Sequence, residues 1–261
     1  MTPRAHKTFR LNSRAWLPLV GPIILLAAWG LLVQARIVSP VLLPGPLTTL
    51  EHLGASIASG AIAGDFMMTL WRTLQAFMIA TAIGVPLGVA LGASEGVYRS
   101  VEFLIDFFRS TPSSALIPLF MLIFGISDIN KVAIAAFAAF LVILFNSAYG
   151  VMNAKRTRIM AAAVMRANRF QIFRDVLLWE SLPQTFIGLR NGVSMALVIV
   201  VVAEMFMGAD DGLGQRIINA QQVMNVREMY ASILAAGVLG YVLNLLFLLI
   251  DKKIIHWSGR S

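Results

Sequence analysis

The sequence predicts an all-α integral membrane protein with six membrane-spanning helices. Of its 261 residues, 58% are hydrophobic and only 13% are charged, whereas soluble domains are about 45–50% apolar and about 25% charged. The mean hydropathy of +0.79 points the same way. Charged side chains also divide the chain into six apolar stretches, each near the roughly 20 residues that cross a bilayer. This composition excludes a disordered chain, a coiled coil and a typical nucleic-acid-binding domain.

The limits of the six helices follow from where the charges stop. No charged residue lies between Arg14 and Arg36, and Glu204 is the only one between Arg190 and Asp210. Val33-Gln34-Ala35 would also fit the cleavage site of a signal peptide, but the apolar run before it exceeds the usual 7–15 residues. We therefore expect helices near 16–35, 70–93, 110–127, 132–152, 186–207 and 229–250.

The third expected span has the least regular sequence. Pro112 and Pro118 lie within it, and Val101–Phe108 before it is apolar apart from Glu102 and Asp106. We interpret Val101–Phe108 as an amphipathic helix that packs beside or on the membrane.

Lysine and arginine predict the orientation. With the N-terminus inside, sixteen of the 21 basic residues lie on the inner side and five on the outer side. Basic residues gather in cytoplasmic loops, so both termini are expected in the cytoplasm. Residues 1–15 would be a cytoplasmic arm and residues 16–261 a single transmembrane domain. The net charge of +8 thus reports topology and indicates no nucleic-acid partner.

The longest inner connection, residues 153–185, is basic and poor in turn residues. Its pattern predicts two short amphipathic helices across the cytoplasmic face. Two interpretations are open: a basic helix resting on anionic lipid, and a docking element for a soluble partner.

Three further features lie within or beside the spans. Gly84, Gly88 and Gly92 follow a four-residue spacing that lets another helix approach closely. Glu204 and Asn146 are polar residues inside apolar stretches, and such residues are often functional. Each also has a structural interpretation: Glu204 as a carboxylate at the membrane interface, Asn146 as a partner in a hydrogen bond between helices. The run 109–114, with Arg109, Ser113 and Ser114, interrupts helix and could line a cavity.

The sequence lacks the residues that several kinds of catalytic, nucleotide-binding and metal-binding site require. The chain has no cysteine, no G-x-x-x-x-G-K-[ST] phosphate loop and no H-E-x-x-H zinc motif. We therefore expect no catalytic residue, no metal and no cofactor in this chain. An intramembrane enzyme and an ion-coupled pump lose support.

The chain resembles the permease subunits of binding-protein-dependent ABC importers, and within them the branch for sulfonates, taurine and nitrate. The resemblance covers nearly the whole chain. Its motifs are at 39–46, 69–77, 84–88, 109–119 with 124–125, and 203–204 with 212–214.

The resemblance also covers the family's cytoplasmic coupling loop, with two departures. Leu182-Pro183 fits its end. Met160-Ala161-Ala162 stands where the family has Glu-Ala-Ala, and Arg166 stands where it has a glycine that permits a tight turn. These replacements put the turn geometry and the docking affinity in question.

This resemblance implies a type I importer architecture with cytoplasmic coupling helices. Separate ATPase subunits would bind ATP and Mg and receive the coupling loop, with Arg166, Asn168 and Phe170 closest. An external binding protein would deliver a small solute, and a second permease copy, identical or paralogous, would complete the path. The path candidates are Arg109, Ser113, Ser114, Asn146 and Glu204. The alternative function is a non-transport membrane scaffold or assembly protein with a basic docking loop.

Overall fold

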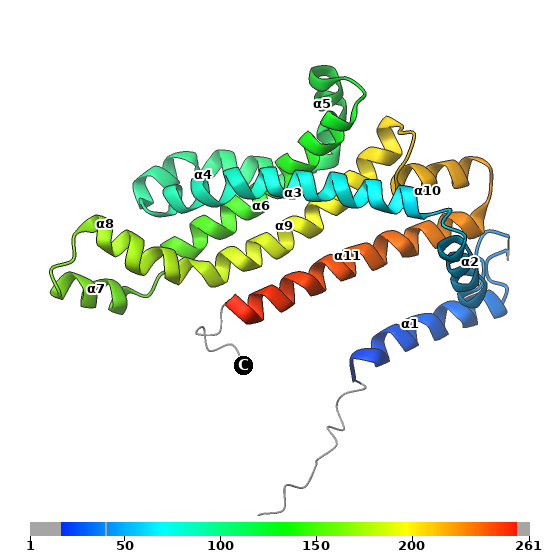
Figure 1. The fold of residues 1–261 in the computed structure, drawn as a ribbon, viewed down its shortest axis with the longest axis horizontal. Coiled ribbons are helices and arrows are strands. Elements are labelled where there is room, and N and C mark those ends of the chain that lie inside the picture. Colours follow the sequence, from blue (N-terminus) through cyan, green and yellow to red (C-terminus); the bar gives the residue numbers. More distant parts are fainter. Residues whose placement is uncertain (1–16, 40, 255–261) are drawn as a thin grey trace, which may run out of the picture.

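The computed structural model describes residues 17–39 and 41–254, and these residues form helices and no strands. Four long helices run side by side: α3 (Ala63–Gly92), α6 (Asp128–Met152), α9 (Leu178–Met207) and α11 (Val226–Ile254) (Figure 1). The all-helical prediction is confirmed. The expected N-terminal arm, residues 1–15, lies outside the described residues.

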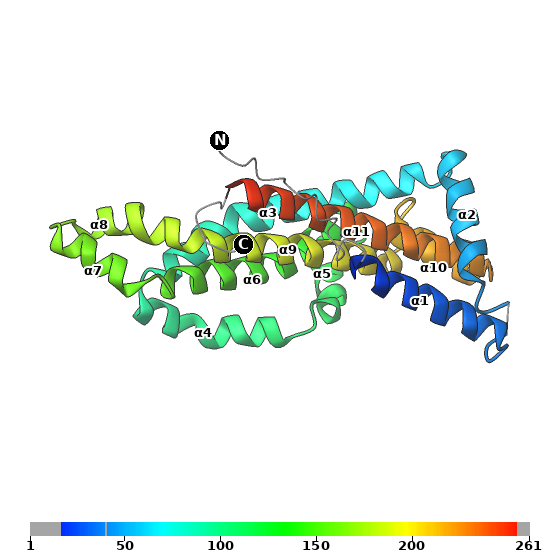
Figure 2. The same cartoon turned by 90° about the horizontal axis from the view of Figure 1, so that it is seen from below.

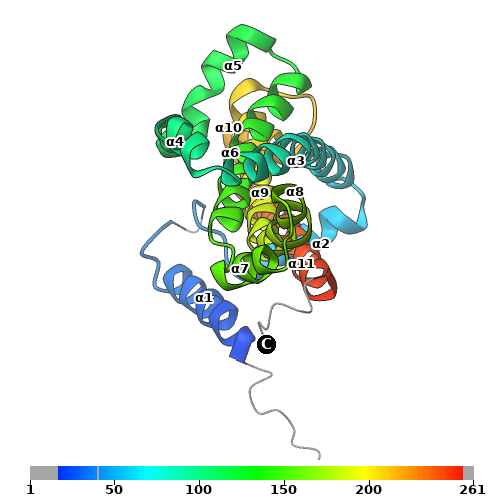
Figure 3. The ribbon, with the colours of Figure 1, turned by 90° about the vertical axis from the view of Figure 1, so that its left-hand side faces the viewer.

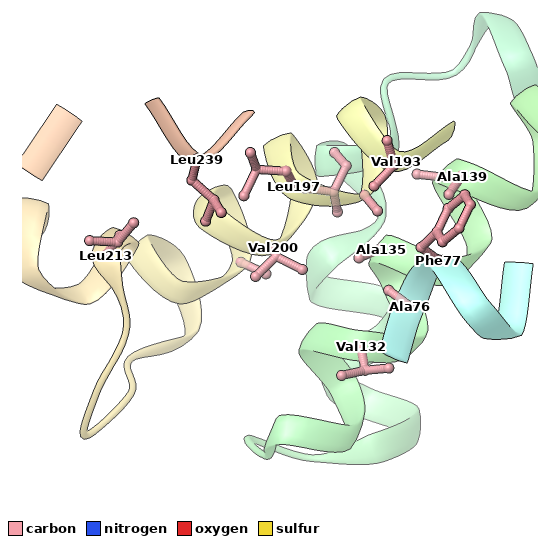
Figure 4. Close-up of a cluster of buried hydrophobic side chains, with 14 of the residues drawn as sticks. Ala76, Phe77, Val132, Ala135, Ala139, Val193, Leu197, Val200, Leu213 and Leu239 are labelled. Atoms are coloured by element: carbon pink, nitrogen blue, oxygen red, sulfur yellow. The ribbon is translucent and has the colours of Figure 1, made fainter. Parts of the chain in front are cut away.

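Helix α6 is the centre of the bundle and packs against both α3 and α9. Alanines such as Ala135 and Ala139 are fully buried along it, and their small side chains let the neighbouring helices approach closely. Side chains of α9, among them Val193 and Val200, fill the space between α6 and α11 (Figure 4).

Short elements gather at the two ends of the bundle (Figure 1). One end, called the α7 end, carries α7 (Arg156–Val164) and α8 (Arg169–Ile172). The other, called the α10 end, carries α10 (Leu213–Gln222) and α2 (Pro46–Ala58), which lies crosswise to the long helices (Figure 2). Helix α1 (Leu17–Gln34) stands apart from the bundle (Figure 3).

The third expected span is not one helix. Helix α4 (Glu95–Ser110) is followed by the short 3-10 helix η1 (Ser113–Leu116) and by α5 (Ile117–Phe124), and the two parts meet at 89°. Pro112 prevents α4 from continuing, because proline disfavours helix in the residue before it. With eight residues α5 reaches only about 12 Å. The described chain thus has four helices able to cross a membrane, or five if the bent pair is one broken span.

Two of the expected helix starts were also wrong. Helix α3 begins at Ala63 instead of residue 70, so Arg72 lies well inside it. The fifth span does not begin at 186, because α8 continues through a π-helical turn, Phe173–Leu177, directly into α9. Of the two short helices expected in 153–185, only α7 is separate.

Candidate functional site

An arginine near the α10 end holds three carboxylates from different segments. Arg72 on α3 is only 3% exposed. Its Nη1 donates to Glu204 Oε1 at 2.8 Å, and its Nη2 donates to Asp211 Oδ1 at 2.7 Å. Nη2 also lies 2.8 Å from Oδ1 of Asp128, the first residue of α6. One guanidinium therefore ties α3, α6, α9 and the turn 208–212 together.

The carboxylate of Glu204 is fully buried and is surrounded by donors. Besides Arg72, it accepts hydrogen bonds from Thr69 Oγ1 and from the backbone N–H of Gly214, both at 2.9 Å. A buried carboxylate is tolerated only with such partners. The turn around it needs glycine, because Gly212 has φ +120° and a Cβ there would stand 2.5 Å from the Glu204 carboxyl carbon.

A second cluster holds α10 against its neighbours. Arg216 on α10 donates through Nε to Glu228 Oε1 at 2.5 Å and through Nη1 to Asp65 Oδ2 at 2.8 Å. Glu228 also pairs with His52 Nε2 at 2.5 Å. Burial opposes the charge of Arg216, but these two carboxylates outweigh it and hold the pKa of its guanidinium above the ordinary value. Helices α2, α3, α10 and α11 are thus joined by hydrogen bonds and ion pairs.

At the α7 end, α7 and α8 form a tight hairpin. Arg166 adopts φ +61°, and the N–H groups of Arg166 and Ala167 donate to the oxygens of Ala163 and Ala162. These two bonds form a Schellman cap, whose left-handed position is usually glycine. Asn168 and Gln171 then cap α8 reciprocally. The tight turn therefore forms with arginine in place of glycine.

The hairpin presents an apolar tip. Met160, Val164, Met165 and Phe170 are 62%, 84%, 82% and 67% exposed. Such a concentration of large apolar side chains at a chain reversal is a typical sign of a contact with another protein or with lipid.

Close helix packing joins α3 to α6. A Cβ on Gly88 would stand 2.8 Å from the Ser147 Cβ, and one on Gly92 would stand 2.5 Å from the Ala148 oxygen. Gly84 is less crowded, with its nearest neighbour at 3.2 Å. Glycine at these positions is what lets the two helices touch.

A family model describes most of this helical arrangement. Residues 80–256 match the model of the "Binding-protein-dependent transport system inner membrane component". The chain belongs to this family. It is the non-catalytic membrane permease of an ABC importer and provides the translocation path for a solute.

Individual relatives agree with the family. A probable ABC transporter permease of Brucella abortus is 31% identical over 85% of this chain and 88% of its own length. The taurine transport system permease of Escherichia coli K12 is 28% identical over 91% of this chain and 88% of its own. A chain of the inward-facing MetNI methionine ABC transporter has a similar fold, with a TM-score of 0.64 at 22% sequence identity. The similarity covers 72% of this chain and 94% of that one.

The residues that the sequence suggested for the path of this permease lie in separate places. Glu204 is buried at the α10 end. The Arg109 guanidinium carbon lies 4.0 Å from the centre of the Phe145 ring on α6. Ser113 and Ser114 lie in the short helix η1 between α4 and α5.

Asn146 joins two helices of the permease. Its Nδ2 donates to the Val142 oxygen at 2.8 Å, and its Oδ1 accepts from Gln184 Nε2 on α9 at 2.9 Å. The neighbouring Gly188 leaves room for it, since a Cβ there would stand 2.5 Å from the Asn146 Cβ. Both atoms of the amide are therefore used within the chain.

Sequence reasoning missed the centre of the permease's main polar cluster. The expected helix 70–93 put Arg72 in its first turn, and neither Arg72 nor Asp211 was among the candidate residues. The available signal was the helical pattern before residue 70, which would have placed Arg72 inside α3 and so required a carboxylate partner. In the described residues, no group of three or more His, Asp or Glu side chains could hold a metal ion.

Proposed function

We propose that this permease works as one half of a pore, with both termini in the cytoplasm. The α7 end then faces the cytoplasm and the α10 end faces an external binding protein. The distribution of lysine and arginine supports this orientation, since sixteen of 21 fall on the cytoplasmic side. Reporter fusions at residues 45 and 215 should be external and one at residue 160 internal; an external signal at 160 would contradict the orientation.

We propose further that the α7–α8 hairpin docks on a cytoplasmic ATPase subunit that binds ATP and Mg. The apolar tip is the observation that carries this proposal. Phe170, 67% exposed and directly after the Asn168 cap, is its largest side chain. Arg166 and Arg169 flank it with positive charge. Met160, Ala161 and Ala162 lie on α7, the other helix of the hairpin.

Substitution of Phe170 tests the docking. Phe170→Asp places an unpaired charge in an apolar contact, so coupled ATP hydrolysis should fall about tenfold or more while membrane insertion stays normal. Phe170→Leu keeps an apolar contact and should lose little. Thr157→Asp adds the same charge at the base of α7, which is exposed and away from the tip, and should behave as wild type. Normal coupling in the Phe170→Asp variant would reject the docking site.

The translocation path is proposed to lie between two permease copies. One copy has only scattered polar groups near its bent region and long helices: Arg109, Ser113, Ser114, Asn146 and Glu204. A symmetric pair would double this lining, and twofold dimers are the commonest oligomers. Co-expression of two differently tagged forms of the chain tests this. Recovery of both tags together supports a homodimer, and recovery of a paralogous permease instead would indicate a heterodimer.

The cargo is proposed to be a small solute handed over at the α10 end. The sulfonate, taurine or nitrate class expected from the resemblance is one candidate. A cavity beside Arg72, described in the next subsection, favours a solute of a different chemical class. ATP-driven uptake by proteoliposomes that contain the permease, its ATPase and its binding protein tests the transport function itself; uptake that persists without this chain would reject it.

A further inference from the structure

A cavity of about 960 Å³ lies beside Arg72, between α3, α5 and α6. In Figure 1, α5 projects away from the long helices. The volume falls within the range of small-molecule sites, which is roughly 300–1,000 Å³. Six of the residues that line the cavity carry the argument: Trp71, Arg72, Gln75, Met78, Phe120 and Phe137.

The walls of this cavity are suited to a planar ring. Phe120 and Phe137 pack with ring centres 5.9 Å apart on one side. Trp71 and Met78 on α3 face the same space and are 57% and 63% exposed in the single chain. Aromatic and thioether side chains bind flat rings through stacking and sulfur contacts.

Arg72 and Gln75 are polar groups beside this cavity. Arg72 has five N–H donors, and its Nη atoms make four contacts with Glu204, Asp211 and Asp128. Its Nε is buried without a hydrogen bond. Gln75, one turn further along α3, is half-buried and lines the same cavity. The Gln75 side-chain amide can donate to or accept from a polar edge of a ring held in this cavity.

The charge around the cavity does not favour an anion. Met68 and Trp71 also line an adjoining cavity of about 470 Å³ that contains Asp65 and Asp211. Together the two cavities carry three carboxylates, Asp65, Asp128 and Asp211, against the single guanidinium of Arg72. The ion-pair partners of these lining residues do not change the sign of the balance. With the partners included there are four carboxylates and three cations: Asp65, Asp128, Glu204 and Asp211, and Arg72, Lys131 and Arg216. An anionic solute would find no uncompensated positive charge.

We propose that this cavity binds a small solute with a planar heteroaromatic ring and no net negative charge, on its way through the permease. The ring would lie between Trp71 and the Phe120–Phe137 pair, with a polar edge toward Gln75. This site deepens the transport function proposed above and rests on it. Its chemistry differs from that of the sulfonate, taurine or nitrate class implied by the resemblance.

Equilibrium binding to the permease–ATPase complex in nanodiscs tests the site. The binding protein is left out, so that any signal comes from the membrane part. The probes are riboflavin, an uncharged ring, and tryptamine, a cationic ring, with taurine and hexanesulfonate as the sulfonates. Saturable binding is expected for at least one ring compound and for neither sulfonate.

Three variants locate the binding. Trp71→Leu removes the stacking surface and should weaken ring binding about tenfold. Gln75→Leu should weaken it several-fold. Tyr241→Leu removes an exposed aromatic ring on α11, away from the cavity, and should leave binding unchanged.

Four results would overturn the proposed site. The first is tighter binding of a sulfonate than of either ring compound, and the second is no saturable binding of the rings. The third is unchanged ring binding in Trp71→Leu. The fourth is displacement of the ring by added phospholipid, which would make an acyl chain the occupant. ATP-driven uptake is measured in parallel on the complete transporter. If uptake continues but one of these four binding results is observed, the proposed site is rejected and the transport function is retained.

Discussion

Arg72 Nη1 and Glu204 Oε1 lie 2.8 Å apart although their residues are 132 positions apart in the sequence. The two side chains are 3% and 0% exposed. Since α3 and α9 pack against α6 and against each other, this ion pair and its partners Asp128 and Asp211 join the three helices at the α10 end. If the translocation path opens at this end, as proposed above, these contacts must rearrange.

Removing one partner of the buried pair should be more harmful than removing both. Glu204→Leu leaves the Arg72 charge short of its most buried partner and should lower the free energy of unfolding by about 3 kcal/mol. The double variant Arg72→Met, Glu204→Leu should recover part of that loss. Denaturant titration in mixed micelles measures both, with the exposed Asp106→Asn as control. Additive losses in the double variant would show that the two residues are not energetically coupled.

Two glycines in one turn should respond differently to alanine. Gly208 has φ +71° with no atom near its missing Cβ, whereas Gly212 has φ +120° and the Glu204 carboxylate beside it. Gly208→Ala should therefore cost only the backbone strain, about 1 kcal/mol. Gly212→Ala should cost clearly more, because the buried carboxylate must move. Equal thermal midpoints for the two variants would contradict this arrangement.

A similar pair on α3 tests the contact with α6. A Cβ on Gly88 would collide with α6, and Gly64 has open space around it. Gly88→Ala should lower the yield of folded protein and its thermal midpoint, because α3 and α6 must separate. Gly64→Ala should raise stability by about 0.5–1 kcal/mol through helix propensity. Tolerance of Gly88→Ala would mean that the helices pack less closely.

The α7–α8 hairpin should become more rigid when glycine replaces Arg166. Arg166 holds φ +61°, which disfavours residues with a side chain. Relief of about 1 kcal/mol in Arg166→Gly should slow amide exchange in α7 about fivefold. Arg166→Ala loses the charge and keeps the strain, so its exchange should match the wild type. Faster exchange in the glycine variant would show that the arginine side chain itself supports the turn.

The Arg72 cluster should act as part of an external gate. Asp128 and Asp211 both contact Arg72 Nη2, and both are partly exposed, at 58% and 40%. The chain has no cysteine, so Asp128→Cys with Asp211→Cys gives a clean background. A bifunctional methanethiosulfonate should then stop ATP-driven uptake, and reduction should restore it. Full uptake by the cross-linked form, with each single-cysteine variant as control, would remove this cluster from the gate.

The sequence determined the helical membrane class, because apolar runs bounded by charges depend only on local composition. It also determined the family, through motifs at fixed positions along the chain. Composition could not determine where each helix begins. Helix α3 extends seven residues before its expected start, and the charge of Arg72 inside it is stabilised only by carboxylates from distant segments.

The tertiary structure decided which polar residues meet. Glu204 and Asn146 were both singled out by their apolar surroundings, yet one is held by Arg72 and the turn 208–214, and the other by Gln184. The bend at Pro112 and the turn at Arg166 were decided in the same way, since a backbone break or a strained φ is tolerated where neighbouring contacts fix it. Sequence patterns indicate the structure that each segment prefers by itself. Only the packing of the helices shows which buried charges have a partner and which donor, such as Arg72 Nε, has none.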